Sequence, residues 1–198
     1  LSITPVRGIE KLCVGKTMHQ APKISSRVCG ICPIAHTLAG VGAMEASIGC
    51  EIPQDAYLLR TILQCANRLH SIALHDILVL PDMYIPGTDT KINPFTSEEP
   101  VRTVAKRIQK LREVGQTVGE IAGGEAIHPS NPRVGGMFYN ISPQAKQKIY
   151  DLAKEALPLA IAQMEFMNAV FKNWENRSTV TVGKTEVEIP EKFGYHDQ

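Results

Sequence analysis

Residues 27–36 read Arg-Val-Cys-Gly-Ile-Cys-Pro-Ile-Ala-His, and the rest of the chain is organised around this stretch. Proline is favoured in the first turn of a helix, so Pro33 predicts a helix that starts after Cys32, with Cys29 on the tight turn before it. Unpaired backbone N–H groups and the positive end of the helix dipole at that start favour thiolate over thiol. His36 follows Cys32 by four residues on the same helix face. The stretch therefore predicts two convergent anionic ligands with a hydrogen-bonding histidine.

Three interpretations of the cysteine pair follow from the residues alone. An inert buried pair is the simplest. A thioredoxin-like redox pair would follow a buried strand, but residues 23–27 (Lys-Ile-Ser-Ser-Arg) are too polar for one. A zinc half-site would need a second close pair of ligands, whereas Cys13, Cys50 and Cys65 are scattered singly. None of the three explains the arginine before the pair or the histidine after it.

Length and composition limit the class of protein. A chain of 198 residues suits one domain, and such a chain can bury roughly 70% of its unfolded surface. The net charge of +1 argues against a nucleic-acid partner, which would favour a basic excess. No apolar run reaches the roughly 18 residues of a transmembrane segment, and we see no signal peptide. Five cysteines without such a signal indicate a reducing compartment, the cytoplasm.

Hydrophobic periodicity predicts a mainly α fold, a bundle of four or five helices with a small β-hairpin. Residues 1–18 are expected to form an entry strand or loop with a turn at Gly15. The expected helices cover residues 19–28, 33–49, 53 to about 80, 98–122 and 143–174. Pro158 should kink or break the last of them. The alternating residues of 179–189 predict the hairpin.

The helix expected from 53 to about 80 is apolar nearly all round, which predicts a central position with neighbours on every side. We interpret His70 and His75 as hydrogen-bonded core histidines, and Cys65 as core filling. The charged residues of the 98–122 helix are expected to form a solvated face: Lys106, Arg107, Lys110, Arg112 and Glu113.

Residues 27–36 resemble the N-terminal metal motif of the large subunit of nickel-iron hydrogenases. Upstream, Pro-Val-Arg-Gly-Ile-Glu-Lys at 5–11 resembles the same family, at the family's distance from the cysteines. Downstream, Gly-Glu-Ala-Ile-His-Pro at 124–129 and the glycines at 135–136 recur in the family's order. The resemblance thus covers most of the chain, and it implies the helix bundle of that family.

Within the family, residues 3–8 and 32–38 are most similar to the catalytic (alpha) chain of the branch that reduces the deazaflavin coenzyme F420 in methanogenic archaea. The resemblance implies heterolytic splitting of dihydrogen at a nickel-iron centre whose iron carries carbonyl and cyanide ligands. Cys29 would be a terminal nickel thiolate and Cys32 a thiolate bridging nickel and iron. His36 would donate a hydrogen bond to the bridging sulfur. Electrons would pass through the iron-sulfur clusters of a small subunit, then through the FAD of a flavin-containing subunit, to F420.

The resemblance also implies roles for two residues away from the cysteines. Glu10 is either a solvated surface charge, the usual state of glutamate, or a ligand of a magnesium or iron ion, as in the family. His128 would lie at the interface with the small subunit, facing its iron-sulfur cluster. We interpret both residues in the family's sense.

The chain departs from the family pattern at both ends. Family large subunits begin with a further segment and end with a second two-cysteine motif, and residues 1–198 contain neither. We therefore interpret 1–198 as one domain, the N-terminal part of a large subunit, and expect the isolated piece to be inactive. Two alternatives stay open: a related hydrogenase that reduces a nicotinamide or a heterodisulfide reductase, and a non-enzymatic scaffold. The scaffold would resemble the respiratory complex I subunit that has lost the cysteines, so the retained cysteines argue against it.

Overall fold

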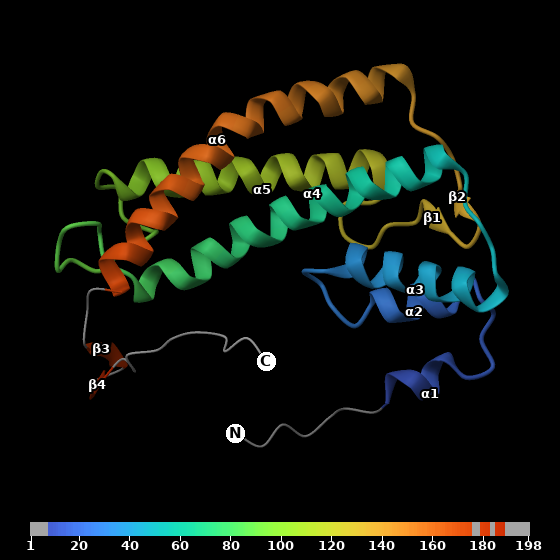
Figure 1. Ribbon diagram of the computed structural model, residues 1–198, viewed down its shortest axis with the longest axis horizontal. Coiled ribbons are helices and arrows are strands. Elements are labelled where there is room, and N and C mark those ends of the chain that lie inside the picture. The colour runs from blue at the N-terminus through green and yellow to red at the C-terminus, as the bar shows by residue number, and fades with distance from the viewer. Residues whose placement is uncertain (1–7, 176–178, 183–184, 189–198) are drawn as a thin grey trace.

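The computed structural model describes residues 8–175, 179–182 and 185–188 (Figure 1). The helices are α1 (Ile9–Cys13), α2 (Ala21–Ser26), α3 (Pro33–Ile48), α4 (Gln54–Val79), the 3-10 turn η1 (Leu80–Asp82), α5 (Val101–Gly123) and α6 (Pro143–Glu175). The strands are β1 (Pro132–Arg133), β2 (Gly136–Met137), β3 (Thr179–Val182) and β4 (Thr185–Glu188). The prediction of a mainly helical fold with a small hairpin is confirmed.

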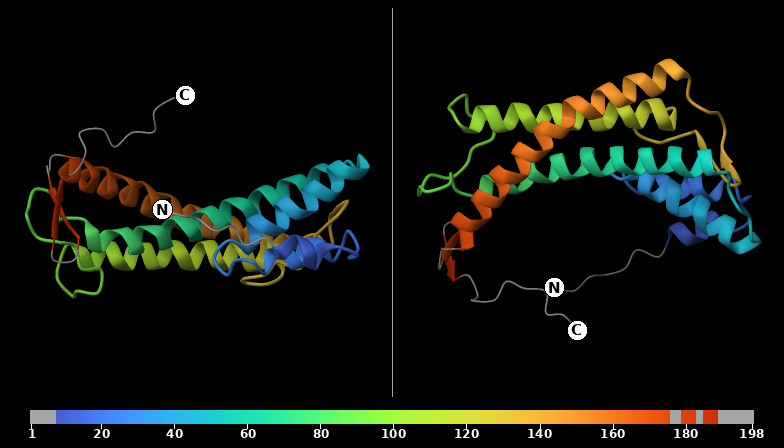
Figure 2. Two further views of the ribbon diagram at one scale, coloured as in Figure 1. Left: turned by 90° about the horizontal axis from the view of Figure 1, so that it is seen from below. Right: turned by 45° about the horizontal axis from the view of Figure 1, so that its top comes forward.

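Three long helices, α4, α5 and α6, form the frame of the molecule. The short helices α1 and α2 gather with α3 at one end of this frame, and the β3–β4 hairpin lies at the other end (Figures 1 and 2). Helix α3 packs against both α2 and α4. The residues between α2 and α3 are therefore held beside the middle of the long helices.

The seam between α4 and α5 is the centre of the hydrophobic core. Helix α5 buries an apolar stripe along this seam, as its periodicity predicts: Val101, Val104, Ile108, Leu111, Val114 and Val118. A β-carbon at Gly115 would lie 2.7 Å from the backbone nitrogen of His70 and 2.8 Å from the carbonyl oxygen of Ala66. The glycine thus lets the two helix backbones approach closely.

Helix α6 runs through Pro158 without a break. Figure 1 shows that its axis changes direction about midway. Of the two outcomes expected from the proline, a kink or a break, the kink is therefore observed. Its first half stands away from α4 and α5 around an apolar groove lined by Ile62, Val118 and Ala156. Its second half closes on the core through Met167 and Val170, which are buried.

Several predicted boundaries and elements were wrong. Residues 9–13 form the short helix α1 where a strand or loop was expected, although the turn at Gly15 is present with φ of 74°. The β1–β2 pair was missed because two-residue strands give no readable alternation. Helix α4, by contrast, has the predicted central position, packed against α3 and α5. The described residues leave part of its apolar surface exposed, at Tyr57, Leu58, Ile72 and Leu78.

The predicted hairpin of residues 179–189 is antiparallel, with Thr179 opposite Glu188 and Val182 opposite Thr185. Its turn, residues 183–184, lies outside the described residues. Among the helices of the described residues, none has the length and apolar content needed to cross a bilayer.

Candidate metal centre

The cysteine turn lies between two helices that pack against each other. Helix α2 ends at Ser26, and α3 begins at Pro33 with Cys32 as its N-cap residue. This is the helix start that the proline predicted. Because α2 and α3 pack together, the turn that connects them, residues 27–32, is held at both ends. The position of Cys29 relative to Cys32 is therefore set by a short, anchored segment of backbone.

The turn and the first turn of α3 bring three ligand atoms together. The sulfurs of Cys29 and Cys32 and a ring nitrogen of His36 all lie within 4.8 Å of one another, and all three residues are half-buried. The predicted convergence of the two sulfurs is confirmed. His36 joins them because an offset of four residues places it one helical turn above Cys32.

Hydrogen bonds divide the two thiols into a donor and an acceptor. The Cys29 sulfur accepts from the backbone N–H of Cys32 at 3.1 Å and of Ile31 at 3.4 Å. The Cys32 side chain and these two amides lower the pKa of Cys29. The same side-chain hydrogen bond, burial and the charge on Cys29 raise the pKa of Cys32. The expectation that both thiols favour the thiolate is thus wrong for Cys32, whose pKa is raised.

The donor set suits a soft transition metal. Two sulfurs and an imidazole on one side of an open turn are ligands of the kind that select nickel, copper, zinc and iron over magnesium or calcium. A metal ion that bound both sulfurs would displace the proton that Cys32 retains, because the thiolate is the ligand form of cysteine. The residues present therefore fit a metal centre that needs thiolates from this turn.

Two other predicted site residues lie outside this cluster. Glu10 is an exposed residue of α1 and is not one of the three residues whose ligand atoms converge. His128 is half-buried in the loop after α5, and its Nδ1 is buried with no hydrogen-bond partner in the described part of the chain. Their roles stay predictions. Residues 3–7, which share in the family resemblance, lie outside the described residues.

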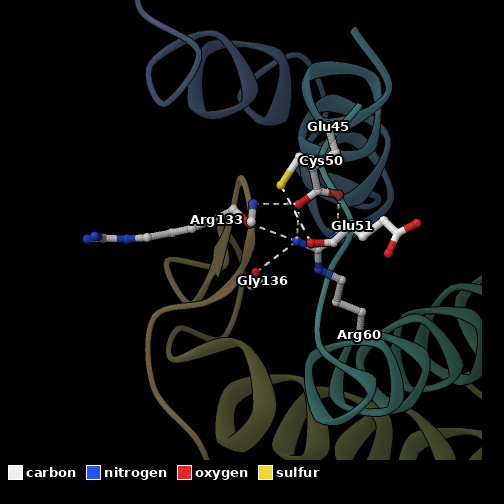
Figure 3. A network of polar contacts seen from close by, with 7 residues as sticks. Glu45, Cys50, Glu51, Arg60, Arg133 and Gly136 are labelled. Carbon is white, nitrogen blue, oxygen red and sulfur yellow. Dashed lines mark hydrogen bonds and ion pairs between the residues drawn. The ribbon is translucent and has the colours of Figure 1, made fainter. Parts of the chain in front are cut away.

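The far end of α3 carries a polar network that the sequence did not lead us to expect (Figure 3). Glu45 accepts two hydrogen bonds from the guanidinium of Arg60 on α4, at 2.7 and 2.8 Å. Arg60 also donates to the carbonyl oxygens of Arg133 and Gly136, at 2.7 and 2.8 Å. The N–H of Gly135 donates to Glu45 at 2.8 Å. The network ties α3 to α4 and to the β1–β2 loop; its one sequence signal was a carboxylate on an otherwise apolar helix.

Three expectations about the long helices need correction. His75 and Cys65 are exposed and not part of the core. His70 is half-buried and not fully in the core; it is hydrogen-bonded to the backbone of Arg112, as predicted, while its Nδ1 has no hydrogen-bond partner within the described residues. Of the five residues expected on a solvated face of α5, Lys106 and Glu113 are exposed, whereas Arg107, Lys110 and Arg112 are half-buried because α5 packs against both α4 and α6.

Comparison with protein families identifies the region of the site. Residues 7–77 match the family model described as nickel-dependent hydrogenase. The whole chain is 68% identical to the alpha chain of the coenzyme F420 hydrogenase of Methanosarcina barkeri, of which it covers 43%. Over 81% of its length it is 36% identical to a vhu chain of the F420-non-reducing hydrogenase of Methanocaldococcus jannaschii, covering 39% of that protein. The chain thus spans less than half of these relatives.

A solved structure shows the same arrangement of helices. The chain superimposes on the NAD+-reducing [NiFe]-hydrogenase in its H2-reduced state with a TM-score of 0.72 and 27% sequence identity. The superposition covers 86% of this chain and 39% of the hydrogenase chain. The matched family region contains the three residues of the cluster, Cys29, Cys32 and His36.

Proposed function

The chain belongs to the nickel-dependent hydrogenase family, and from that premise we propose that it is the N-terminal part of the catalytic large subunit of a nickel-iron hydrogenase. The observation that carries the proposal is the convergence of Cys29, Cys32 and His36 within 4.8 Å, inside the region that the family model matches. The chain covers 43% of the length of its relative from Methanosarcina barkeri, so the activity of the whole enzyme is part of the proposal.

In this proposal the turn supplies two thiolates. Cys29 would bind nickel as a terminal ligand, and its lowered pKa supports this role because the thiolate is already favoured before metal arrives. Cys32 would hold the same nickel-iron centre as a second thiolate after losing its proton. When bound, the nickel-iron centre with its carbonyl and cyanide ligands would supply the redox chemistry that splits dihydrogen.

His36 would orient the site without binding metal. A ring N–H donated to the Cys32 sulfur would stabilise its negative charge and fix the direction of its lone pairs. The position of a His36 ring nitrogen within 4.8 Å of both sulfurs supports this role.

We further propose that Glu10 binds a magnesium or iron ion, and that His128 faces an iron-sulfur cluster of a small subunit. The buried, unpaired Nδ1 of His128 supports a partner from outside the described residues. From that subunit, electrons would reach F420 through a flavin-containing subunit. The 68% identity to a chain of an F420 hydrogenase favours this acceptor, while the 36% identity to a chain of an F420-non-reducing enzyme keeps a different acceptor as the second candidate.

The test is replacement of Cys32 by alanine in the full enzyme, with Cys65→Ala as the matched control, since Cys65 is a free, exposed cysteine on α4. We expect Cys32→Ala to lose hydrogen uptake and bound nickel, measured by gas consumption and metal analysis per chain. His36→Ala should be milder, with activity lower by about 10- to 100-fold. Near-normal turnover of Cys32→Ala would refute the proposal, and parallel assays with F420 and with a nicotinamide would decide between the two acceptors.

A further inference from the structure

A cavity of about 190 Å³ lies behind the cysteine turn, between α4 and α5. Gly30 and Ile31, the two residues between the cysteines, line it on one side. Polar residues of the two long helices line it elsewhere: Asn67, His70, Arg112 and Gln116. This volume is well above the roughly 10–15 Å³ that a single water needs in a cavity. It therefore has room for a side-chain carboxylate or a small anion.

Arg112 places a positive charge on the wall of this cavity. Its side chain is half-buried, and its Nε is buried with no hydrogen-bond partner in the part of the chain that the structure describes. Within the same residues no carboxylate forms an ion pair with Arg112, although nearby lysine and arginine side chains, such as Lys110, have one. A charge partly removed from water without a counter-ion is costly. An anion in the cavity would offset that cost.

His70 presents a second unsatisfied group on the same wall. Its Nδ1 is buried and lacks a partner among the described residues. Burial, and then the charge of Arg112, lower the pKa of His70, although a hydrogen bond with the backbone of Arg112 opposes this shift. An anion seated beside Arg112 would cancel that repulsion, so that His70 could donate from Nδ1 as well. A single negatively charged hydrogen-bond acceptor could therefore satisfy both Arg112 and His70.

We propose that this cavity binds a carboxylate or a similarly small oxoanion, with Arg112 as the charged anchor and His70, Asn67 and Gln116 as further hydrogen-bonding groups. Arginine suits this role because its planar fork matches the two oxygens of a carboxylate. The carboxylate can come from two sources, a free anion or an acidic side chain of another segment or subunit. Ile31 and Ile127, which line the cavity and are 47% and 49% exposed, lie where a docked segment would cover them.

The experiment uses the protein purified with its own subunits, sodium formate as the probe, and thermal unfolding as the readout. Arg112→Gln removes the anchor, and Arg68→Gln is the matched control because Arg68 is exposed on α4 and outside the cavity. For a free-anion site, formate raises the melting temperature to saturation in the wild type and in Arg68→Gln. The apparent affinity of Arg112→Gln for formate then falls by about 10- to 100-fold, the loss expected for a charged hydrogen bond.

For a carboxylate supplied by a neighbouring segment, formate has no effect on the wild type, since the cavity is already filled. In that case Arg112→Gln, and not Arg68→Gln, lowers the salt concentration at which the subunits dissociate. Arg112→Lys keeps the charge and should retain part of either response, which covers the case that Arg112→Gln does not fold. If Arg112→Gln and Arg68→Gln behave alike in both assays, the proposal is wrong.

Discussion

Glu45 and Asp76 are carboxylates at the two ends of the molecule, each 7% exposed, and the structure treats them in opposite ways. Glu45 meets a guanidinium, with both oxygens bonded to Arg60, and this ion pair lowers its pKa despite burial. Asp76 meets an amide, the Nε2 of Gln163 at 2.8 Å, and burial raises its pKa. Low surface exposure alone therefore does not decide the charge of a carboxylate; the charge of its hydrogen-bond donor contributes as well.

Arg107 is linked to Asp76 only indirectly, through Gln163. The Nε of Arg107 donates to Gln163 at 3.0 Å, and Gln163 in turn donates to Asp76. Gln163 is itself buried, so the chain of bonds joins α5, α6 and α4 within the core. The neutral amide of Gln163 thus lies between Arg107 and Asp76. It satisfies the hydrogen bonds of both residues without bringing their opposite charges into contact. The two networks thus make different predictions for substitution.

Arg60→Met should have the largest effect, because it leaves Glu45 buried without its cation and the carbonyls of Arg133 and Gly136 without a donor. Breaking a buried ion pair from one side costs about 3–5 kcal/mol. The measurement is the free energy of unfolding by urea denaturation. Arg102→Met is the control, since its ion pair with Glu99 is half exposed and such pairs contribute about 0–1 kcal/mol. Equal losses in the two variants would contradict this difference between a buried and an exposed ion pair.

Glu45→Gln should cost less, about 1–3 kcal/mol at neutral pH, because glutamine keeps the shape and part of the hydrogen bonding. Since the folded pKa of Glu45 lies below its ordinary value of 4.5, the stabilisation by its charge is fully present above pH 4.5. It is lost as the pH falls through the folded pKa. The unfolding free energies of wild type and Glu45→Gln should converge on acidification.

Glu51→Gln is the matched control for that pH series, because Glu51 is exposed beside the same network. Its difference from the wild type should stay within about 0.5 kcal/mol. A constant gap between wild type and Glu45→Gln down to about pH 2, well below the ordinary carboxyl range, would show that packing, and not charge, accounts for the loss.

Asp76→Asn should have the smallest effect, within about 1 kcal/mol at neutral pH and in the stabilising direction. Asparagine still accepts from Gln163 and removes the cost of burying a charge. Because the folded pKa of Asp76 is raised, the penalty of its charge is present above that pKa and is relieved as the pH falls toward the ordinary value of 3.8. The gain in stability of Asp76→Asn should therefore shrink on acidification. As with Glu45→Gln, the unfolding free energies of variant and wild type converge at low pH, but here the variant is the more stable of the two at neutral pH.

For Asp76→Asn, the exposed residue Asp82 provides the control, as Asp82→Asn should leave the unfolding free energy unchanged. A loss of more than about 2 kcal/mol in Asp76→Asn, the size expected for a broken charged hydrogen bond, would mean that Asp76 stays charged and contributes as Glu45 does. The charged donor of Glu45 and the neutral donor of Asp76 would then not lead to different contributions of the two carboxylates to stability.

The candidate site was largely readable from the sequence because its geometry is local. Cys29, Cys32 and His36 lie close together in the chain, and the hydrogen bonds to the Cys29 sulfur come from residues two and three positions away. A proline at the helix start and a four-residue offset suffice to place all three groups. The unequal pKa values of Cys29 and Cys32 were not predicted, since they depend on which thiol donates to the other.

The amino-acid sequence by itself determined the helical class, the start of α3 and the convergence of the cysteine turn, because backbone rules acting over three or four residues govern all of these. Tertiary structure alone decided the state of the buried charges. Glu45 meets Gly135 across 90 positions and Asp76 meets Gln163 across 87. Arg112 reaches the cavity behind the cysteines because Gly115 lets α5 approach α4. Such pairings depend on how helices pack, and packing brings together residues that no local pattern relates.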